Sequence, residues 1–146
     1  MPHRDGDDLR NAALNAMPAA CEGWAFAEAQ AEKWAKIIQL RDWVNKALEA
    51  ARNEKVIGKP LEAEVTVYMP EAPDFGEDLA DLCIVSKLEL VAGEGEGYTE
   101  EGWPGVSIKV VRAAGNKCLR CWKISKTIGE NAKHPELCAR CASVVG

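Results

Sequence analysis

A long amphipathic pattern dominates the first third of the chain. Residues 26–53 contain no Gly or Pro, and hydrophobic residues recur at spacings of three and four. Such spacing is typical of an amphipathic helix, which we expect Gly58 and Pro60 to end. A shorter helix is predicted over residues 9–17, stopped by Pro18. The stripe of the long helix consists of Trp34, Ile37, Leu40 or Arg41, Val44 and Leu48.

The middle of the chain changes to the period-2 alternation of β-strands. Ala63, Val65, Val67 and Met69 alternate with polar residues, so we expect a strand with one buried face. Further strands are predicted over residues 83–85, 88–91 and 106–112, and a short helix over residues 75–82. The segment 92–105, which is rich in Gly and Glu, is expected to be a mobile loop.

Four of the six cysteines stand in two CxxC pairs near the end of the chain. Their spacing is Cys118-x2-Cys121-x16-Cys138-x2-Cys141. Two residues between cysteines let both sulfurs of a pair reach one ion from a tight turn, and two such knuckles complete the tetrahedron that zinc adopts with thiolates. Because four protein ligands leave no open position for water, we expect one structural zinc ion per chain and no catalysis by the metal.

Other uses of the cysteines fit the pattern less well. A redox CxxC pair would follow a strand and open a helix, and we expect neither pair to do so. A rubredoxin-like iron site usually carries Gly after the second cysteine of a pair, where this chain has Trp122 and Ala142. His134 could replace one ligand, but the second pair is complete without it. Cys83 is expected to be a small buried hydrophobe, and Cys21 a free thiol.

These patterns predict an α+β fold in three parts. Residues 1–60 form a helical segment, residues 61–112 a small α/β unit with mostly antiparallel strands, and residues 113–146 a zinc-ribbon-like four-cysteine finger. With 146 residues, of which 47% are hydrophobic and 28% charged, the chain can build one ordinary core or two small ones. The finger is too small for a core of its own, and such modules usually need a metal to fold.

The net charge of −5 hides an uneven distribution. Residues 1–108 carry 10 basic and 21 acidic residues, whereas residues 109–146 carry 8 basic and 2 acidic ones, a balance of +6. A basic module on an acidic body suits phosphate binding, although solubility alone would account for it equally well. No apolar run approaches the roughly 20 residues that span a bilayer. The polar, acidic start is unlike a signal peptide, so we expect a cytoplasmic protein with no membrane partner.

A tryptophan and several cations surround the metal-binding pairs. Trp122 directly follows a predicted ligand, so the knuckle fixes its backbone. A rigidly held indole beside cations suits stacking on an unpaired base, with Lys and Arg side chains meeting phosphates. Alternatively, Trp122 only covers the metal site. The neighbouring cations are Arg120, Lys123, Lys126, Lys133 and Arg140.

The finger carries a recognisable sequence pattern. It reads KCLRCW over residues 117–122 and LCARC over residues 137–141. This pattern resembles the C-terminal zinc finger of bacterial isoleucyl-tRNA synthetases. Residues 41–52, RDWVNKALEAAR, and 57–63, IGKPLEA, are similar to the same family's passage out of its anticodon-binding helical bundle. The resemblance covers nearly the whole chain and is weakest in the Gly/Glu segment.

The resemblance implies a part of an ATP-dependent isoleucine–tRNA ligase. In that family this region follows the catalytic core, binds zinc, contacts the anticodon side of the tRNA and supports aminoacylation. The implied partners are isoleucine tRNA and the remainder of the synthetase, and no DNA partner is expected. Trp122 is then expected to stack in the anticodon loop, while Arg120, Lys123 and Arg140 meet phosphates.

Much of the synthetase pattern is missing from this chain. It has no HIGH-type signature, no Rossmann nucleotide domain and no editing domain. Residues 123–127, KISKT, resemble the KMSKS loop, but they lie between the two knuckles with no nucleotide fold to close over. We therefore expect an excised fragment that catalyses nothing by itself.

Two other functions stay open at this point. Formamidopyrimidine-DNA glycosylases end in a similar four-cysteine finger and use an N-terminal proline as nucleophile. Pro2 follows Met1 here, but His3 stands where that family has Glu, and 146 residues leave little room for its other domains. The second alternative is a stand-alone zinc module that binds a protein through the hydrophobic stripe of the long helix.

Overall fold

The computed structural model describes residues 6, 10, 12–15, 19 and 21–146. Within the helix predicted over residues 9–17, Ala12–Leu14 forms a 3-10 turn, η1. The other residues of that prediction, apart from 10 and 15, and its stop at Pro18 lie outside the described residues. A second 3-10 turn, η2, covers Glu22–Trp24. The chain divides into two compact units, residues 1–32 and 33–146.

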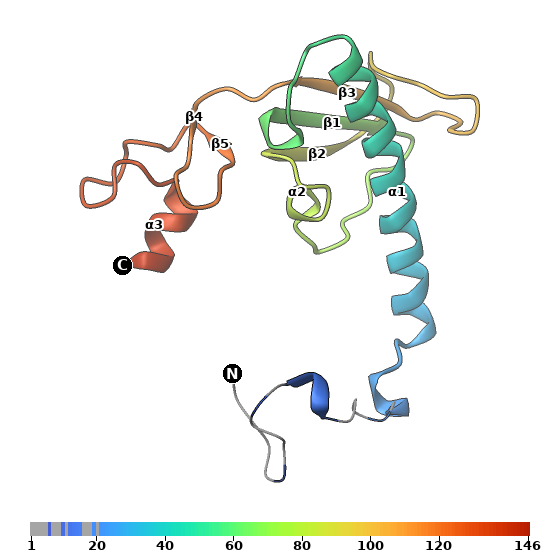
Figure 1. The fold of residues 1–146 in the computed structure, drawn as a ribbon. Coiled ribbons are helices and arrows are strands. Elements are labelled where there is room, and N and C mark those ends of the chain that lie inside the picture. The colour runs from blue at the N-terminus through green and yellow to red at the C-terminus, as the bar shows by residue number, and fades with distance from the viewer. Residues whose placement is uncertain (1–5, 7–9, 11, 16–18, 20) are drawn as a thin grey trace. The chain divides into compact units, whose positions relative to one another are not determined.

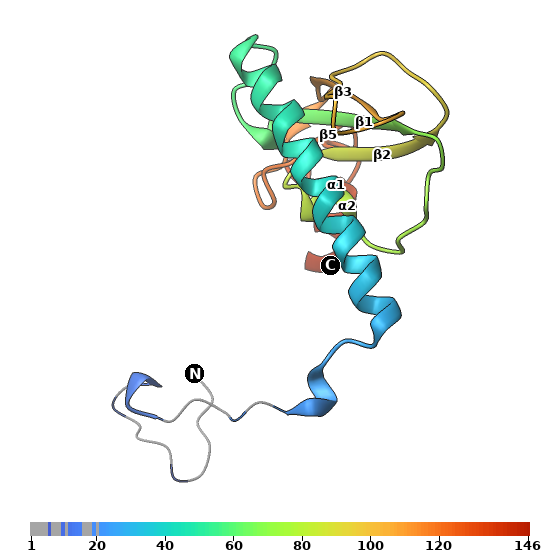
Figure 2. The same cartoon turned by 90° about the vertical axis from the view of Figure 1, so that its right-hand side faces the viewer.

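The long helix predicted over residues 26–53 is confirmed as α1, Glu28–Asn53. Figures 1 and 2 both show its C-terminal half lying against a small sheet. The predicted stripe is buried from Ile37 onward, whereas Arg41 is exposed. Because this stripe packs inside the chain, it is not available as a docking surface for a separate protein. The buried residues of α1 are Ile37, Leu40, Val44, Ala47, Leu48 and Ala51.

Helix α1 ends at Asn53, earlier than the glycine and proline that the sequence suggested. Lys55 adopts the left-handed conformation with φ of 61°. Its N–H donates to the carbonyl of Arg52, and the N–H of Val56 donates to the carbonyl of Ala51. This pair of hydrogen bonds is the Schellman arrangement, which satisfies the last carbonyls of a helix and usually places Gly at the left-handed position.

A three-stranded sheet forms the centre of the second unit, in the order β2-β1-β3. Strand β1 is Ala63–Met69, β2 is Lys87–Ala92 and β3 is Ser107–Arg112. The α+β class is confirmed, but the sheet is mixed: β1 pairs with β2 in parallel and with β3 in antiparallel fashion. The connection from β1 to β2 is a crossover through a short helix, so β2 enters in the same direction as β1.

The segment before β2 differs from the prediction in two ways. The helix expected over residues 75–82 is reduced to α2, Leu79–Leu82, which Asp78 caps. The strand expected over residues 83–85 is wrong, because these residues form the turn that follows α2. Ile84 is left-handed with φ of 58°, and the N–H of Val85 donates to the carbonyl of Ala80. Short apolar runs do not distinguish a strand from a buried turn by periodicity alone.

The Gly/Glu segment was predicted over residues 92–105; Ala92 is the last residue of β2, and the rest of the segment has no regular helix or strand, as predicted, but packs against α1. Trp103 is buried, and its ring centroid lies 5.5 Å from that of Trp43. Lys46 and Glu100 form an ion pair of 2.7 Å across the same contact. Tyr98 pairs with Ile108 of β3 through an isolated bridge. The mobility expected for this segment stays a prediction.

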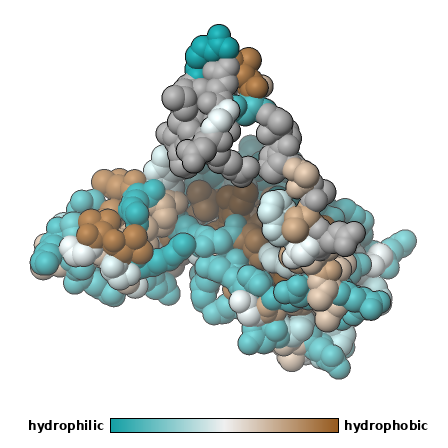
Figure 3. All heavy atoms as spheres, turned by 90° about the horizontal axis from the view of Figure 1, so that it is seen from below, coloured by the Kyte–Doolittle hydropathy of each residue, from teal (hydrophilic) through white to brown (hydrophobic). Residues whose placement is uncertain are grey.

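The finger has its own small elements. These are β4, Asn116–Lys117, β5, Ile124–Ser125, and α3, Ala139–Val145. Its buried residues form a cluster separate from the main core, which joins α1, the sheet and the Gly/Glu segment. Figure 3 shows some hydrophobic surface on the lobe that holds the finger. Among the residues that the structure describes, no helix is long and apolar enough to cross a membrane.

Candidate metal centre

The structure brings together the four cysteines that the sequence predicted. The Sγ atoms of Cys118, Cys121, Cys138 and Cys141 all lie within 4.8 Å of one another. The Sγ atoms of Cys121 and Cys138 are 3.8 Å apart. Tetrahedral zinc with bonds of ~2.3 Å to sulfur requires sulfurs about 3.8 Å apart. All four thiols are free, so the cluster fits a structural zinc ion and not a pair of disulfides.

Two different local structures present the sulfurs. At the first pair, the N–H of Trp122 donates to the carbonyl of Cys118, and the N–H of Cys118 donates to the carbonyl of Lys123. At the second pair, Cys138 is the N-cap of α3. The second pair therefore opens a helix, but it follows turns and coil and not a strand, so it has only half of the redox pattern. The redox interpretation still fails, because the four sulfurs form one group.

The pKa values of the thiols show why the cluster needs a cation. Burial opposes ionisation of Cys118, but backbone N–H groups, first among them that of Cys121, outweigh it and lower the pKa to about 6. Burial and the neighbouring thiols raise the pKa of Cys121 to about 12, and burial also raises that of Cys141. Four thiolates cannot share this volume without a positive charge between them, and a divalent metal supplies it.

The remaining candidate ligands lie elsewhere. The His134 ring nitrogen Nε2 is 3.3 Å from the backbone oxygen of Gly146 and is not part of the metal cluster. Cys83 is buried in the main core, which confirms the prediction of a small buried hydrophobe. Cys21 is exposed and free, as expected. The described residues contain no other cluster of three or more potential metal ligands within reach of one ion.

Trp122 lies on the surface beside the metal site. Its side chain is 60% exposed, and its backbone is left-handed with φ of 67°. The ammonium of Lys117 lies 5.3 Å from the centroid of the Trp122 ring, a cation–π distance. Most of the indole therefore faces solvent.

The predicted phosphate-binding cations have different surroundings. Arg120 is exposed, and no ion pair to it is found within the described part of the chain. Lys123 is only 16% exposed, and its Nζ lies 2.7 Å from Asp81 of α2. Arg140 is exposed and lies 3.1 Å from the other oxygen of the same carboxylate. The hydrogen bond from Lys123 outweighs partial burial and holds the pKa of Asp81 below its usual value.

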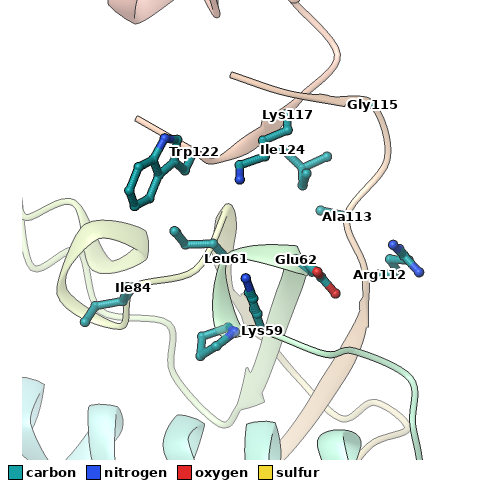
Figure 4. A pocket seen from close by; sticks show the side chains of 11 residues that line it. Lys59, Leu61, Glu62, Ile84, Arg112, Ala113, Gly115, Lys117, Trp122 and Ile124 are labelled. Carbon is teal, nitrogen blue, oxygen red and sulfur yellow. The ribbon is translucent and has the colours of Figure 1, made fainter. Parts of the chain in front are cut away.

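A pocket of about 690 Å³ separates the finger from the α/β unit. Figure 4 shows Trp122, Lys117 and Ile124 on the finger side, opposite Leu61 and Ile84. The cations that line this pocket are Lys59, Arg112 and Lys117. A volume of this size is in the range that accommodates a small ligand or one nucleotide of a longer chain.

Sequence reasoning missed the groups that connect the two modules. Ser86 donates its hydroxyl to the carbonyl of Leu61 at 2.5 Å and accepts the backbone N–H of Ile124 at 2.6 Å. Asp81 gives the ion pairs described above. No spacing in the sequence indicates these contacts, because a single Asp or Ser in a polar segment is usually a solvated surface residue.

Comparison with known proteins supports the sequence resemblance. A family model described as "Zinc finger found in FPG and IleRS" matches residues 115–144. An isoleucine–tRNA ligase of Bacillus mycoides is 43% identical over 151 residues, covering 99% of this chain. One from Bacillus cereus is 42% identical over 156 residues, again covering 99% of the chain. One from Syntrophotalea carbinolica is 42% identical over 120 residues, covering 78% of it.

The chain matches the C-terminal region of the isoleucine–tRNA ligases. It spans only 13% to 16% of the length of these relatives. Their similarity extends through α1 and the sheet, well beyond the finger that the family model shares with another class of protein. Pro2 and His3, on which the glycosylase alternative depended, lie outside the described residues.

Proposed function

We propose that this chain is a tRNA-contacting end of an isoleucine–tRNA ligase, meeting the anticodon side of isoleucine tRNA and supporting aminoacylation by the whole enzyme. Trp122 stacks on an unpaired base, and Arg120 meets a neighbouring phosphate. The observation that carries the proposal is the exposed indole, held beside the zinc knuckle and lining a pocket that also holds three cations and one carboxylate. The proposal includes the predicted division of the chain into a helical segment, a small α/β unit and a zinc finger, over residues 1–60, 61–112 and 113–146.

The surface around Trp122 suits a single-stranded nucleic acid. A base stacks on an aromatic face, while the phosphates on either side need positive charge. Lys117 lies next to the indole, and Lys59 and Arg112 line the same pocket, where the carboxylate of Glu62 offsets part of their charge. The excess of basic residues in the finger draws the anionic chain toward this face, although the body of the protein is acidic.

Lys123 and Arg140 were predicted to meet phosphates, and this stays a prediction. Their ion pairs with Asp81 offset part of their charge before any RNA arrives. Arg120 keeps its charge uncompensated by any ion pair within the described residues. We therefore rank Arg120 above the other two as a phosphate contact.

Substituting Trp122 tests the stacking role. Because Trp122 has a left-handed backbone, Trp122→Gly relieves backbone strain and should leave the knuckle folded and zinc bound. Stacking on an aromatic contributes roughly 1–3 kcal/mol per base, so Trp122→Gly and Trp122→Ala should both weaken isoleucine-tRNA binding about 5- to 150-fold. Binding should be measured in the full-length ligase, together with aminoacylation and zinc content.

Two controls separate stacking from charge and from general damage. Trp24, which is 73% exposed, is a second surface tryptophan, and Trp24→Ala should leave tRNA affinity unchanged. Arg120→Ala should reduce the slope of log affinity against log salt concentration by about 0.7 to 0.9. The Trp122 variants should leave this slope unchanged. If Trp122→Gly keeps zinc, tRNA affinity and aminoacylation intact, the stacking role is wrong.

A further inference from the structure

Few contacts determine how the finger sits on the α/β unit. Their hydrophobic clusters are separate, so no shared core sets the angle between them. The chain connection itself is short, with the N–H of Ala113 bonded to the carbonyl of Glu62. Beyond it lie the hydrogen bond from Ile124 to Ser86 and the two ion pairs of Asp81. The orientation of the finger therefore depends on a handful of polar groups.

Asp81 is the group that reaches both halves of the metal site. Its Oδ1 lies 2.7 Å from Nζ of Lys123, which follows the first cysteine pair. Its Oδ2 lies 3.1 Å from Nη1 of Arg140, which stands inside the second pair. Two contacts on different knuckles restrain rotation of the finger as well as its distance from α2. A single ion pair or hydrogen bond would leave the finger free to turn about it.

The pocket beside Trp122 exists only in this orientation. Trp122 and Lys117 come from the finger, while Leu61 and Ile84 come from the α/β unit (Figure 4). A turn of the finger about its connection would separate these walls. The zinc ion cannot prevent such a turn, because all four of its ligands belong to the finger itself.

We propose that Asp81 is a positioning residue for tRNA binding, which locks the zinc finger onto the α/β unit and so holds Trp122 opposite Ile84. This inference rests on the proposed function. It assigns Lys123 and Arg140 the role of docking cations, in place of direct phosphate contacts. Ser86 supports the same junction through the backbone of β5.

The direction in which tRNA affinity changes when Asp81 is neutralised distinguishes a positioning role from a purely electrostatic one. Asp81 is an anion on the side of the molecule that is proposed to meet RNA, and it partly neutralises two cations. By charge alone, replacing it with a neutral residue should strengthen tRNA binding. If Asp81 positions the finger, the same replacement should weaken binding although the protein becomes more positive. Partly exposed ion pairs contribute modestly, so we expect a loss of about 3- to 10-fold.

The experiment compares Asp81→Asn, Asp81→Glu and Glu130→Gln in the full-length ligase. Glu130 is exposed on the finger and has no ion pair within the described residues, so its variant makes the same change in charge without touching the junction. Asp81→Asn should raise the KM for isoleucine tRNA about 3- to 10-fold with little change in kcat. Asp81→Glu should restore most of the affinity, and Glu130→Gln should bind tRNA as well as or better than the parent.

A measurement without RNA tests the junction directly. Residual dipolar couplings on the zinc-loaded 146-residue chain report whether the finger and the α/β unit tumble as one body. We expect a single alignment tensor in the parent and two different tensors in Asp81→Asn, with zinc retained in both. Equal tensors in Asp81→Asn would overturn the positioning role.

Measurements of tRNA binding distinguish a failure of the positioning role from a failure of the tRNA-contacting function on which it rests. If Asp81→Asn binds tRNA as well as the parent while Trp122→Gly weakens binding, the positioning role fails and the tRNA-contacting function stands. If neither variant changes tRNA binding, the proposed function fails as well. A loss in Asp81→Asn that Asp81→Glu does not restore would also contradict the positioning role.

Discussion

Trp122 carries its side chain on a backbone conformation that non-glycine residues seldom adopt. Its φ of 67° lies in the left-handed region, where an L-residue is less stable by roughly 1–2 kcal/mol. Glycine would meet the needs of the knuckle without this strain. The residue is nonetheless a large aromatic with most of its surface in solvent. Strain at an exposed aromatic is a reason to look for a ligand, and it agrees with the stacking role proposed here.

The buried thiol of Cys83 leads to a prediction about reactivity. Burial raises its pKa to about 11, although Arg41 opposes this shift. Since the thiolate is the reactive form, a pKa of about 11 leaves roughly one thiol in a thousand ionised at pH 8. We expect iodoacetamide at pH 8 to label the exposed Cys21 and to spare Cys83 in the folded, zinc-loaded chain. Peptide mass spectrometry locates the label.

The direction of the pH dependence provides the check on that prediction. Because the folded-state pKa of Cys83 is raised, its labelling rate should increase about tenfold for each pH unit between 8 and 10, until the protein unfolds. Unfolding in urea should remove the protection altogether. Rapid labelling of Cys83 at pH 8 in the folded chain would contradict its assignment to the core.

At the scale of elements, the chain enters the finger through a close contact between the backbones of Gly115 and Ser125. Gly115 has φ of 121°, and a Cβ at this position would collide with the carbonyl oxygen of Ser125. This contact lies where β4 pairs with β5, so the backbone itself occupies the space that a side chain would need. Only glycine satisfies both the dihedral angle and the close packing.

Substituting this glycine should damage the finger selectively. Gly115→Ala introduces both backbone strain and a collision, so we expect at least about 1–3 kcal/mol of lost stability and weaker zinc binding. Gly129→Ala is the matched control, because Gly129 also has a positive φ, 95°, but has open space around its Cα. Competition with a zinc-binding dye measures the difference. Equal zinc affinities in the two variants would show that the collision is relieved by a backbone shift.

At the scale of the whole molecule, the second unit contains two cores that are stabilised in different ways. The main core joins α1, α2, the three-stranded sheet and Trp103 through hydrophobic burial. The finger buries little besides three of its four cysteines, Leu137 and Ala142. Burial of so few side chains cannot offset the conformational entropy of a module this size. Most of the finger's stability must therefore come from its metal.

Removing zinc should accordingly unfold one part and spare the other. We expect Cys138→Ser, or a strong chelator under reducing conditions, to unfold residues 113–146 while the sheet and α1 stay folded. Amide hydrogen exchange read by mass spectrometry distinguishes the parts, and elemental analysis should find one zinc per chain before treatment. Loss of protection throughout β1 after chelation would show that the two cores fold as one.

The sequence alone was sufficient for features that depend on local pattern. The period of α1, the alternation in β1 and β3 and the spacing of the two CxxC pairs are each contained in a short stretch of chain. Each therefore predicted its structure or its metal. The errors fell where local signals conflict. Residues 83–85 are apolar enough for a strand, but Ile84 is turned into the left-handed region at the end of α2, so that Val85 is buried from a turn.

Tertiary structure alone decided what the charged residues do. In the sequence Lys123 and Arg140 belong to a basic tail whose only acidic residues are Glu130 and Glu136, and neither of these pairs with them in the structure. Folding brings Asp81, some 40 to 60 residues earlier in the chain, to 2.7 Å and 3.1 Å from them. A metal site is predictable because its ligands are close in sequence and their geometry is imposed by the ion. An ion pair between distant segments depends on how the sheet, α2 and the finger pack. Coulomb attraction depends on the distance between the charges in space, so it produces no periodic pattern in the sequence.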